Sequence, residues 1–394
     1  MYRAVLIAFF ALVFIPSTYP QAQADPPLVG PLLGATNAQQ DAILLHDLGT
    51  GTTRQLRFDT RWHMLWGFSA DGCRVIYTLS TNGALGRAYS ARLDGSDVRE
   101  LVQFSELPPD QWEVWEAQPS PDGNRIAFTL IRTTLLADGT PERSYHIAWV
   151  GAQGGVPEFY SITGDEHEPE WSPDGQWLAY ISYTRRVPGA DIYSTAAPTP
   201  EGQPVNTAAM LREADLWVVS ADGQTKYNLA NFPTGSLRAP RWSPDGSLIS
   251  FVYSPSPGND QFWMIANAQG AIPTQLSQQW SLILDTTWLP DSTAIISAAR
   301  DFRDVAENVL WQVPLVGSAD SNAVRYLGDP ALSYTDYPRF SPDGRYLALR
   351  SSYAVALVDL ANNGWRLVDE FGLGNMPPVW SPAAFVGEAA CSQN

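Results

Sequence analysis

The chain has 394 residues and carries 24 Lys and Arg against 41 Asp and Glu, which gives a formal net charge of −17. Such an acidic surface argues against nucleic acids and anionic membranes as partners. Only 16% of the residues are charged whereas 12% are aromatic, and wide aromatic side chains suit the spaces between packed β-sheets.

The N-terminus predicts a secretory signal peptide over residues 1–24. A basic start at Arg3 precedes an apolar run from Ala4 to Pro16, and the triplet Ala22-Gln23-Ala24 is typical of a cleavage site. The run is shorter than the ~20 residues that span a membrane, although an uncleaved anchor is the alternative. We therefore expect a periplasmic or secreted protein, cleaved after Ala24, with no stable membrane span. Residues 25–41 are expected to form a lead-in.

One phrase, Pro-x-Trp-Ser-Pro-Asp-Gly followed by an apolar run, then recurs along the chain. Its clearest copies lie at 169–175 and 240–246, and a third copy, at 338–344, has Phe340 in place of Trp. Pro, Asp and Gly in this order favour a tight turn. The turn aspartates recur roughly every 50 residues with one longer gap, at Asp71, Asp122, Asp174, Asp245, Asp291 and Asp343. A period of this length built of strands predicts an all-β protein, a β-propeller of four-stranded antiparallel blades.

Residues 165–232 illustrate one blade. We expect an inner strand over 167–172, a second strand over 177–181 that is apolar at every position, a third over 216–219 and an outer strand over 226–232. The same pattern predicts six complete blades between residues 62 and 370.

Two fragments remain, and each is half a blade. Residues 377–390 are expected to supply an inner strand and, at 384–386, a second strand, while residues 42–58 supply a third and fourth. Joined, they make a seventh blade that closes a propeller over residues 42–390 and leaves 391–394 as a tail. Closure of this kind removes open sheet edges. A six-bladed propeller is the alternative.

The repeat resembles that of the TolB-like propellers of bacterial periplasmic proteins, and it is similar to the repeat in the propellers of dipeptidyl peptidase IV relatives. The resemblance covers residues ~42–390 and implies the propeller fold. TolB carries a separate domain ahead of a six-bladed propeller, and the peptidases carry a hydrolase domain with a Gly-x-Ser-x-Gly elbow. This sequence shows neither pattern, so we expect a propeller that stands alone.

Alternation along the inner strands predicts which side chains line the central channel. Pro169 and Trp171 share the packing parity, and the opposite parity is polar in most blades. The predicted channel lining is Gln118, Glu170, Arg241, Thr287 and Arg339. The predicted binding residues at the channel mouth are Trp115, Glu116, His167, Glu168, Arg238, Asp285 and Asp336. A solvated channel with internal ion pairs and no ligand is the alternative.

Two long segments, Thr133–Arg143 and roughly Tyr183–Ala214, join second to third strands on the face of this mouth. Loops of such length are usually functional or disordered, and recognition loops on a rigid scaffold are common. An insertion without function is the alternative.

The sequence offers little for catalysis. The four histidines lie in different blades, and His167 near Glu168 and Glu170 has no comparable partner from a neighbouring blade. We therefore expect no metal, no cofactor and no catalytic residue, and a non-catalytic module that binds a protein segment, peptide or cell-envelope glycan. The alternative is an extracellular polysaccharide lyase or glycosidase that uses the mouth carboxylates.

Cys73 and Cys391 are the two cysteines of a chain expected to be exported, which invites a disulfide. Cys73 follows a turn, however, whereas Cys391 is expected beyond the far end of the strand at 384–386. Six residues of strand cover roughly 20 Å, while bridged Cα atoms lie within about 7 Å. We therefore predict two free thiols unless the C-terminal tail folds back.

Overall fold

The computed structural model describes residues 25–391 apart from 59–61, 81–85, 108–110, 161–164, 184–212, 256–260, 271, 279, 302–307, 328–334, 352–353, 363, 369–370 and 372–375. The predicted signal peptide and the segment 184–212 therefore lie outside the described residues.

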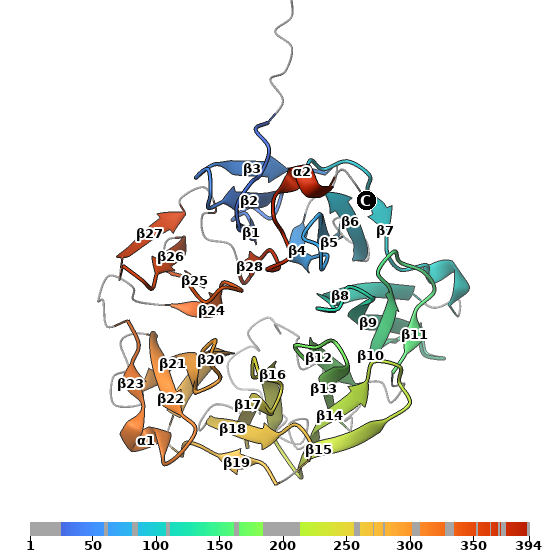
Figure 1. Cartoon of the computed structure of the whole chain (residues 1–394). Coiled ribbons are helices and arrows are strands. Elements are labelled where there is room, and N and C mark those ends of the chain that lie inside the picture. Colours follow the sequence, from blue (N-terminus) through green and yellow to red (C-terminus); the bar gives the residue numbers. More distant parts are fainter. Residues whose placement is uncertain are drawn as a thin grey trace, which may run out of the picture.

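Seven four-stranded antiparallel sheets stand around a central axis, which confirms the seven-bladed propeller (Figure 1). Blade 1 consists of β4 (His63–Phe68), β5 (Arg74–Leu79), β6 (Arg87–Arg92) and β7 (Arg99–Glu100). Blade 2 consists of β8 (Gln111–Pro119), β9 (Arg125–Leu135), β10 (Pro141–Gly151) and β11 (Glu158–Phe159). Blade 3 consists of β12 (Glu166–Trp171), β13 (Trp177–Tyr183), β14 (Ala214–Ser220) and β15 (Lys226–Phe232). Blade 4 consists of β16 (Ser236–Trp242), β17 (Leu248–Ser254), β18 (Phe262–Asn267) and β19 (Thr274–Gln275). Blade 5 consists of β20 (Trp280–Trp288), β21 (Ala294–Asp301), β22 (Val309–Pro314) and β23 (Val324–Arg325). Blade 6 consists of β24 (Asp336–Phe340), β25 (Tyr346–Arg350), β26 (Val355–Asp359) and β27 (Gly364–Val368). Blade 7 consists of β28 (Val379–Trp380), β1 (Leu32–Thr36), β2 (Ile43–Asp47) and β3 (Thr53–Leu56).

Helices are short: η1 (Phe104–Glu106), α1 (Ala319–Asn322) and α2 (Glu388–Cys391). Within the described ranges, none of them has the length and apolar character needed to cross a membrane.

The repeated turn owes its shape to side chains within the phrase itself. In blade 4, Ser243 Oγ donates to Asp245 Oδ1 at 2.6 Å and accepts from the Leu248 backbone N–H at 2.9 Å. Gly246 follows with φ +71°, which a residue with a side chain rarely adopts. These turns lie on one face of the propeller, called here the turn face, and the connections between second and third strands lie on the opposite face.

The core is divided among the spaces between blades. Each of the seven spaces holds one cluster of buried apolar side chains drawn from both neighbouring sheets. Between blades 3 and 4, for example, Leu216 and Val218 pack with Trp242 and Phe251. Stability is therefore shared among the blades, and an open ring would expose a whole apolar sheet face.

Blade 7 is composite, but the division between the chain ends differs from the prediction. The second strand is β1, from the residues expected to be a lead-in, and not 384–386. Leu33 pairs with Trp380 and Gly34 with Val379. A Cβ on Gly34 would come 2.6 Å from Leu65 Cδ2, so the small residue lets blade 1 pack closely.

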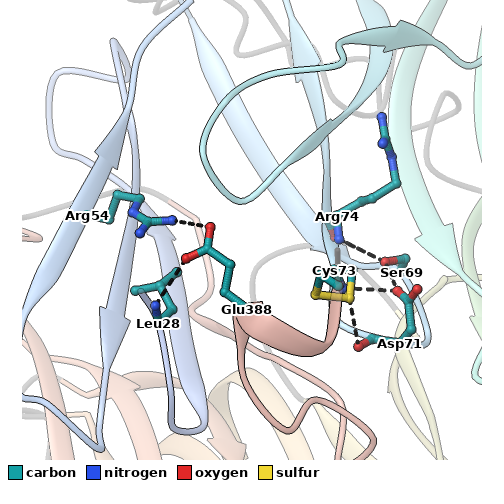
Figure 2. The surroundings of a disulfide bond; sticks show 8 residues. Leu28, Arg54, Ser69, Asp71, Cys73, Arg74 and Glu388 are labelled. Carbon is teal, nitrogen blue, oxygen red and sulfur yellow. Dashed lines mark hydrogen bonds and ion pairs between the residues drawn. A yellow bond between two sulfur atoms is a disulfide. The ribbon is translucent and has the colours of Figure 1, made fainter. Parts of the chain in front are cut away.

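Because β1 fills the place beside β28, the chain after Trp380 stays on the turn face. Phe385 packs into the cluster between blades 7 and 1, and α2 follows. Glu388 of α2 accepts from Arg54 Nη1 of β3 at 2.7 Å and from the Leu28 N–H at 3.1 Å (Figure 2). The C-terminal segment thus holds the N-terminal strands from outside.

The prediction of two free thiols is wrong. Cys391, at the end of α2, forms a disulfide with Cys73, and their Cα atoms lie 5.4 Å apart (Figure 2). The prediction failed because it placed 384–386 in the second strand, which would have carried Cys391 to the opposite face. The actual path folds back onto the turn face.

The segment expected to be a loop at Thr133–Arg143 is instead an extension of the hairpin formed by β9 and β10. Their pairing continues to the contact of Leu135 with Pro141, so only a tight turn connects them. Backbone pairing across the hairpin satisfies the polar groups that a loop would have left to solvent.

Candidate ligand-binding site

The inner strands set the geometry of the axis, and they do not alternate regularly. Each of β4, β8, β12, β16, β20 and β24 has a register shift near its middle. In three blades the shift coincides with a positive φ, at Glu168 (+52°), Ala239 (+51°) and Tyr337 (+49°). A bulge re-aims the side chains on either side of it. The residue four positions before the turn aspartate therefore faces the axis in blades 2 to 6, and the residue six before it does so in blades 1 to 3. The residue seven before it is turned away.

A cavity of about 580 Å³ lies on the axis and is called here the central cavity. Its polar lining is Glu116, Gln118, Glu168, Glu170, Arg241, Thr287, Arg339 and Ser341. Pro244, Pro290 and Pro342 of three repeated turns also line it, so it reaches the turn face. The wall from blades 7 and 1 is mostly apolar, with Leu65, Trp66, Pro377 and Val379.

A chain of ion pairs joins blades 3 to 6 on the polar side of the central cavity. Arg241 lies 3.4 Å from Glu170 Oε2 and 3.2 Å from Asp285 Oδ1, and Arg339 lies 2.7 Å from Asp285 Oδ2. Asp285 is buried, and burial alone would raise its pKa. Arg339 and Arg241 outweigh that effect and hold the pKa of Asp285 below its usual value.

Blades 2 and 3 present carboxyl groups with less compensation. Glu116 Oε2 accepts a long hydrogen bond, 3.4 Å, from Thr129 Oγ1, and Glu168 Oε2 accepts from the Ala239 N–H at 2.6 Å. Burial, reinforced by the charge of Glu168, raises the pKa of Glu116 to about 8. Burial also raises the pKa of Glu170, although Arg241 opposes it. A carboxyl group that is largely protonated at neutral pH therefore faces the central cavity.

Hydrogen bonds from indole N–H groups join neighbouring inner strands around the central cavity. The tryptophan of the repeat donates to a backbone carbonyl on the preceding inner strand, at 2.9–3.0 Å, in four blades: Trp171 to Gln118, Trp242 to Glu170, Trp288 to Arg241 and Trp380 to Arg339. Each accepting residue also has a side chain that lines the central cavity. The packing tryptophan of one blade thus positions the cavity residue of the preceding blade.

The structure brings together every residue predicted to line the channel, and it separates several predicted at the mouth. Glu116 and Glu168 line the central cavity, and Asp285 lies buried behind it. Trp115, His167, Arg238 and Asp336 occupy the position seven before the turn aspartate and do not line it. Regular alternation was assumed for these four, and the bulges break it.

Each of these four has a different environment. Trp115 is 44% exposed. His167 is 1% exposed, with Nε2 2.8 Å from Asp165 Oδ1 and its ring against Tyr145. Arg238 donates to the Ile283 carbonyl of the next blade.

Asp336 forms a two-point ion pair with Arg350, with 2.7 Å between Arg350 Nε and Asp336 Oδ1. Burial raises the pKa of Asp336, and its bonds to Arg350 oppose that rise. His167 and Arg238 therefore make contacts between neighbouring blades, whereas Asp336 is paired within its own blade.

The residues that the sequence reasoning missed are the turn prolines and the apolar wall. The prolines recur in every clear copy of the phrase, so their repetition was a usable signal. Among the described residues, no group of three or more His, Cys, Asp or Glu side chains is arranged to hold a metal ion.

No family model matches the chain. Its sequence is 25% identical over 239 residues to an uncharacterized peptidase, YuxL, of Bacillus subtilis, covering 61% of this chain and 29% of the relative. It is also 25% identical over 120 residues to an uncharacterized protein of Agrobacterium fabrum, covering 29% of this chain and 38% of the relative. The chain thus spans less than half the length of these relatives.

Solved structures with the same fold include a puromycin-hydrolyzing peptidase of Mycobacterium tuberculosis, with a TM-score of 0.56, 14% identity and coverage of 88% of this chain and 53% of that one. An oligogalacturonate lyase in complex with manganese has a TM-score of 0.52, 16% identity and coverage of 83% and 88%. TolB of Acinetobacter baumannii has a TM-score of 0.47, 14% identity and coverage of 91% and 68%. At these identities the two structures with TM-scores above 0.5 show the propeller fold alone.

Proposed function

We propose that the protein is an exported, non-catalytic binding propeller whose central cavity receives a protein segment through a lysine or a free amino group. The observation that supports this is the charge of the cavity. Four carboxyl groups, Glu116, Glu168, Glu170 and Asp285, stand against two guanidinium groups, Arg241 and Arg339, among the described residues at this wall. With Glu116 protonated, the other three carboxyl groups still outnumber the two guanidinium groups. A cationic group from a partner would complement the excess.

Export is part of the proposal. The predicted signal peptide motivates it, and the disulfide between Cys73 and Cys391 supports it because such bonds persist in oxidising compartments. A periplasmic or secreted propeller would then meet partners in the cell envelope or outside the cell.

Binding of a cation should be linked to the proton on Glu116. A positive charge beside a carboxyl group favours its ionised form, so the ligand would displace a proton from a group whose pKa is about 8. Affinity should therefore rise several-fold between pH 6 and pH 9. The probe is acetyl-Gly-Lys-Gly-amide, with norleucine in place of lysine as the neutral control, measured by titration calorimetry in two buffers to count released protons.

Glu116→Gln removes the group with the pKa of about 8 and should reduce the pH dependence of binding. Glu158→Gln, an exposed carboxyl group on the outer strand β11, is the matched control and should retain it. Equal binding of the lysine and norleucine peptides would contradict the proposal, and so would an unchanged pH dependence in Glu116→Gln.

A saccharide lyase or glycosidase is the second candidate, and one observation favours it. A carboxylic acid that stays protonated near neutral pH is the state required of a general acid, and Glu116 has it. Incubation with oligogalacturonate, with and without manganese, and detection of shortened or unsaturated products would test this candidate. Product formation lost in Glu116→Gln but kept in Glu158→Gln would favour the enzyme over the binding module.

A further inference from the structure

A second cavity, of about 660 Å³, lies on the turn face between blades 3 and 4. Its walls include Asp174, Trp177, Tyr227, Trp242, Pro244 and Asp245, and it is called here the blade 3–4 cleft. Trp242 and Pro244 also line the central cavity, so the two cavities adjoin. A chain that occupies the centre could therefore continue across the turn face into the cleft.

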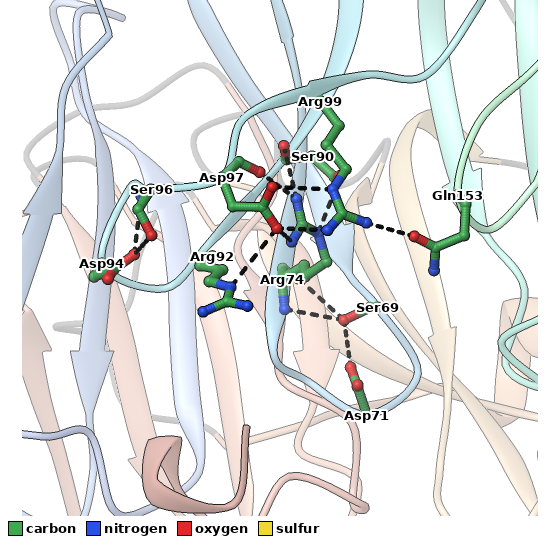
Figure 3. Close-up of polar contacts among 10 residues, drawn as sticks. All are labelled: Ser69, Asp71, Arg74, Ser90, Arg92, Asp94, Ser96, Asp97, Arg99 and Gln153. Carbon is green, nitrogen blue, oxygen red and sulfur yellow. Dashed lines mark hydrogen bonds and ion pairs between the residues drawn. The ribbon is translucent and has the colours of Figure 1, made fainter. Parts of the chain in front are cut away.

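At the residue three positions after the turn aspartate, blades 1 and 2 carry an arginine, whereas blades 3 to 6 do not. In blade 1 this residue is Arg74, which lies 2.8 Å from Asp97 Oδ2 and donates to Ser90 (Figure 3). In blade 2 it is Arg125, whose guanidinium carbon lies 4.4 Å from the centre of the Trp149 ring. These blades supply their own cation at the turn face.

Blade 3 has Trp177 at this position, and no arginine or lysine is among the described residues that line the cleft. The Trp177 ring lies 5.9 Å from that of Tyr227, with the two planes 65° apart. Lys226 is adjacent in sequence, but its amine lies 4.6 Å from the Trp217 ring centre on the other side of the sheet. The aromatic rings of the cleft therefore remain available to an external cation.

Two carboxylates give the cleft its charge. Asp174 and Asp245 each use Oδ1 to bond their own turn, accepting from Ser172 and Ser243 respectively at 2.6 Å. Within the described part of the chain, neither Oδ2 atom makes a hydrogen bond or ion pair. A guanidinium group is planar, stacks on aromatic rings and pairs with carboxylates, and thus fits both features of the cleft.

We propose that the blade 3–4 cleft is a subsite for an arginine side chain of the bound protein segment. The guanidinium would stack on Trp177 or Tyr227 and pair with Asp174 or Asp245, while the neighbouring part of the segment occupies the central cavity. This subsite rests on the proposed function in one respect, because it assumes that the turn face is the binding face.

The test uses acetyl-arginine-amide as the probe and acetyl-citrulline-amide as its neutral isostere. Indole signals of the full-length protein, labelled with ¹⁵N at tryptophan, report on binding, and Trp177→Phe and Trp242→Phe assign the two signals. The arginine probe should shift both signals saturably, with an affinity at least five-fold above that of citrulline. Equal shifts with both probes, or shifts at other indoles only, would overturn the subsite.

Asp174→Asn with Asp245→Asn keeps the Oδ1 acceptors of both turns but removes the charge, and should weaken the arginine probe at least five-fold. The matched control is Asp122→Asn with Asp343→Asn, the same change in blades 2 and 6, where Arg125 and Arg345 already lie over aromatic rings. An equal loss in both double variants would mean an effect of net charge alone and would overturn the proposal. The central cavity is tested separately through Glu116→Gln, so each proposal can fail without the other.

Discussion

The turn face of blades 7 and 1 differs from that of blades 3 and 4, although the same repeat builds both. On blades 7 and 1 the polar groups of the turn face are bonded within the chain, through the disulfide of Cys73 with Cys391 and the pairs of Arg54 with Glu388 and Arg74 with Asp97. On blades 3 and 4 the corresponding surface carries an aromatic cleft and carboxylates without a cation among its described lining residues. We call blades 7 and 1 the closure side and blades 3 and 4 the open side, where the proposed ligand would bind.

The central cavity shows the same division. Blades 7 and 1 contribute Leu65, Pro377 and Val379, whereas the polar lining comes from blades 2 to 6. The cavity wall on the closure side is therefore apolar, and it includes the large side chain of Trp66. This difference predicts that changes on the closure side alter stability and changes on the open side alter binding.

The largest effect is expected from removing the closure. Deletion of residues 377–394 removes β28 and α2, exposes the apolar cluster around Phe385 and leaves the edge of β1 unpaired. The truncated chain should lose cooperative unfolding, measured by circular dichroism during heating, and should elute as aggregates. Deletion of 392–394 alone is the control, and a truncated protein with an unchanged melting temperature would contradict the role of the closure.

Removal of the disulfide should have the next largest effect. The bond joins residues 318 positions apart, so it restricts the unfolded chain strongly. Cys73→Ser with Cys391→Ser should lower the free energy of unfolding by about 3–5 kcal/mol in urea titrations. Reduction of the wild-type protein should lower it similarly, and the double variant should not respond to reductant. Two reactive thiols in the denatured, unreduced wild type would show that the bond is absent.

These two predictions depend on features that the sequence could not reveal in full. The repeat predicted the seven blades and the channel-lining residues from Gln118 to Arg339. It could do so because the turn residues and the apolar runs are visible within short stretches of sequence. The closure was predicted only in outline, because Leu32–Ala35 has no turn phrase before it and its place depends on contact with Leu65 of another blade. The orientations of His167, Arg238 and Asp336 depend on bulges in their strands. The residue types in those strands do not predict where a bulge occurs.

A smaller effect tests the indole contacts that join neighbouring blades. Trp171→Phe keeps the apolar ring in the space between blades 2 and 3 but leaves the Gln118 carbonyl without its donor at 2.9 Å. The free energy of unfolding should fall by about 1–2 kcal/mol.

Blade 6 offers the reverse change, because Phe340 occupies the equivalent position. Phe340→Trp introduces an indole N–H that could donate to the preceding strand, so it should be neutral or stabilising. Equal destabilisation by Trp171→Phe and Phe340→Trp would mean that ring size and not the hydrogen bond matters.

The last effect concerns the proton on Glu116. The folded state retains this proton up to a pKa of about 8, whereas the unfolded chain releases it near 4.5. Between these values the folded state binds more protons, so this group makes stability fall as pH rises from 4.5 to 8, and contributes no further slope above 8.

Glu116→Gln lacks the group, so its stability relative to wild type should increase between pH 5 and pH 8.5 in urea titrations. Glu168, Glu170 and Arg241 surround Glu116 in both proteins, and comparison at each pH removes their shared contribution. Glu158→Gln should show a constant difference from wild type; a constant difference for Glu116→Gln as well would place the carboxyl group in ordinary contact with water and remove the basis for proton-linked binding.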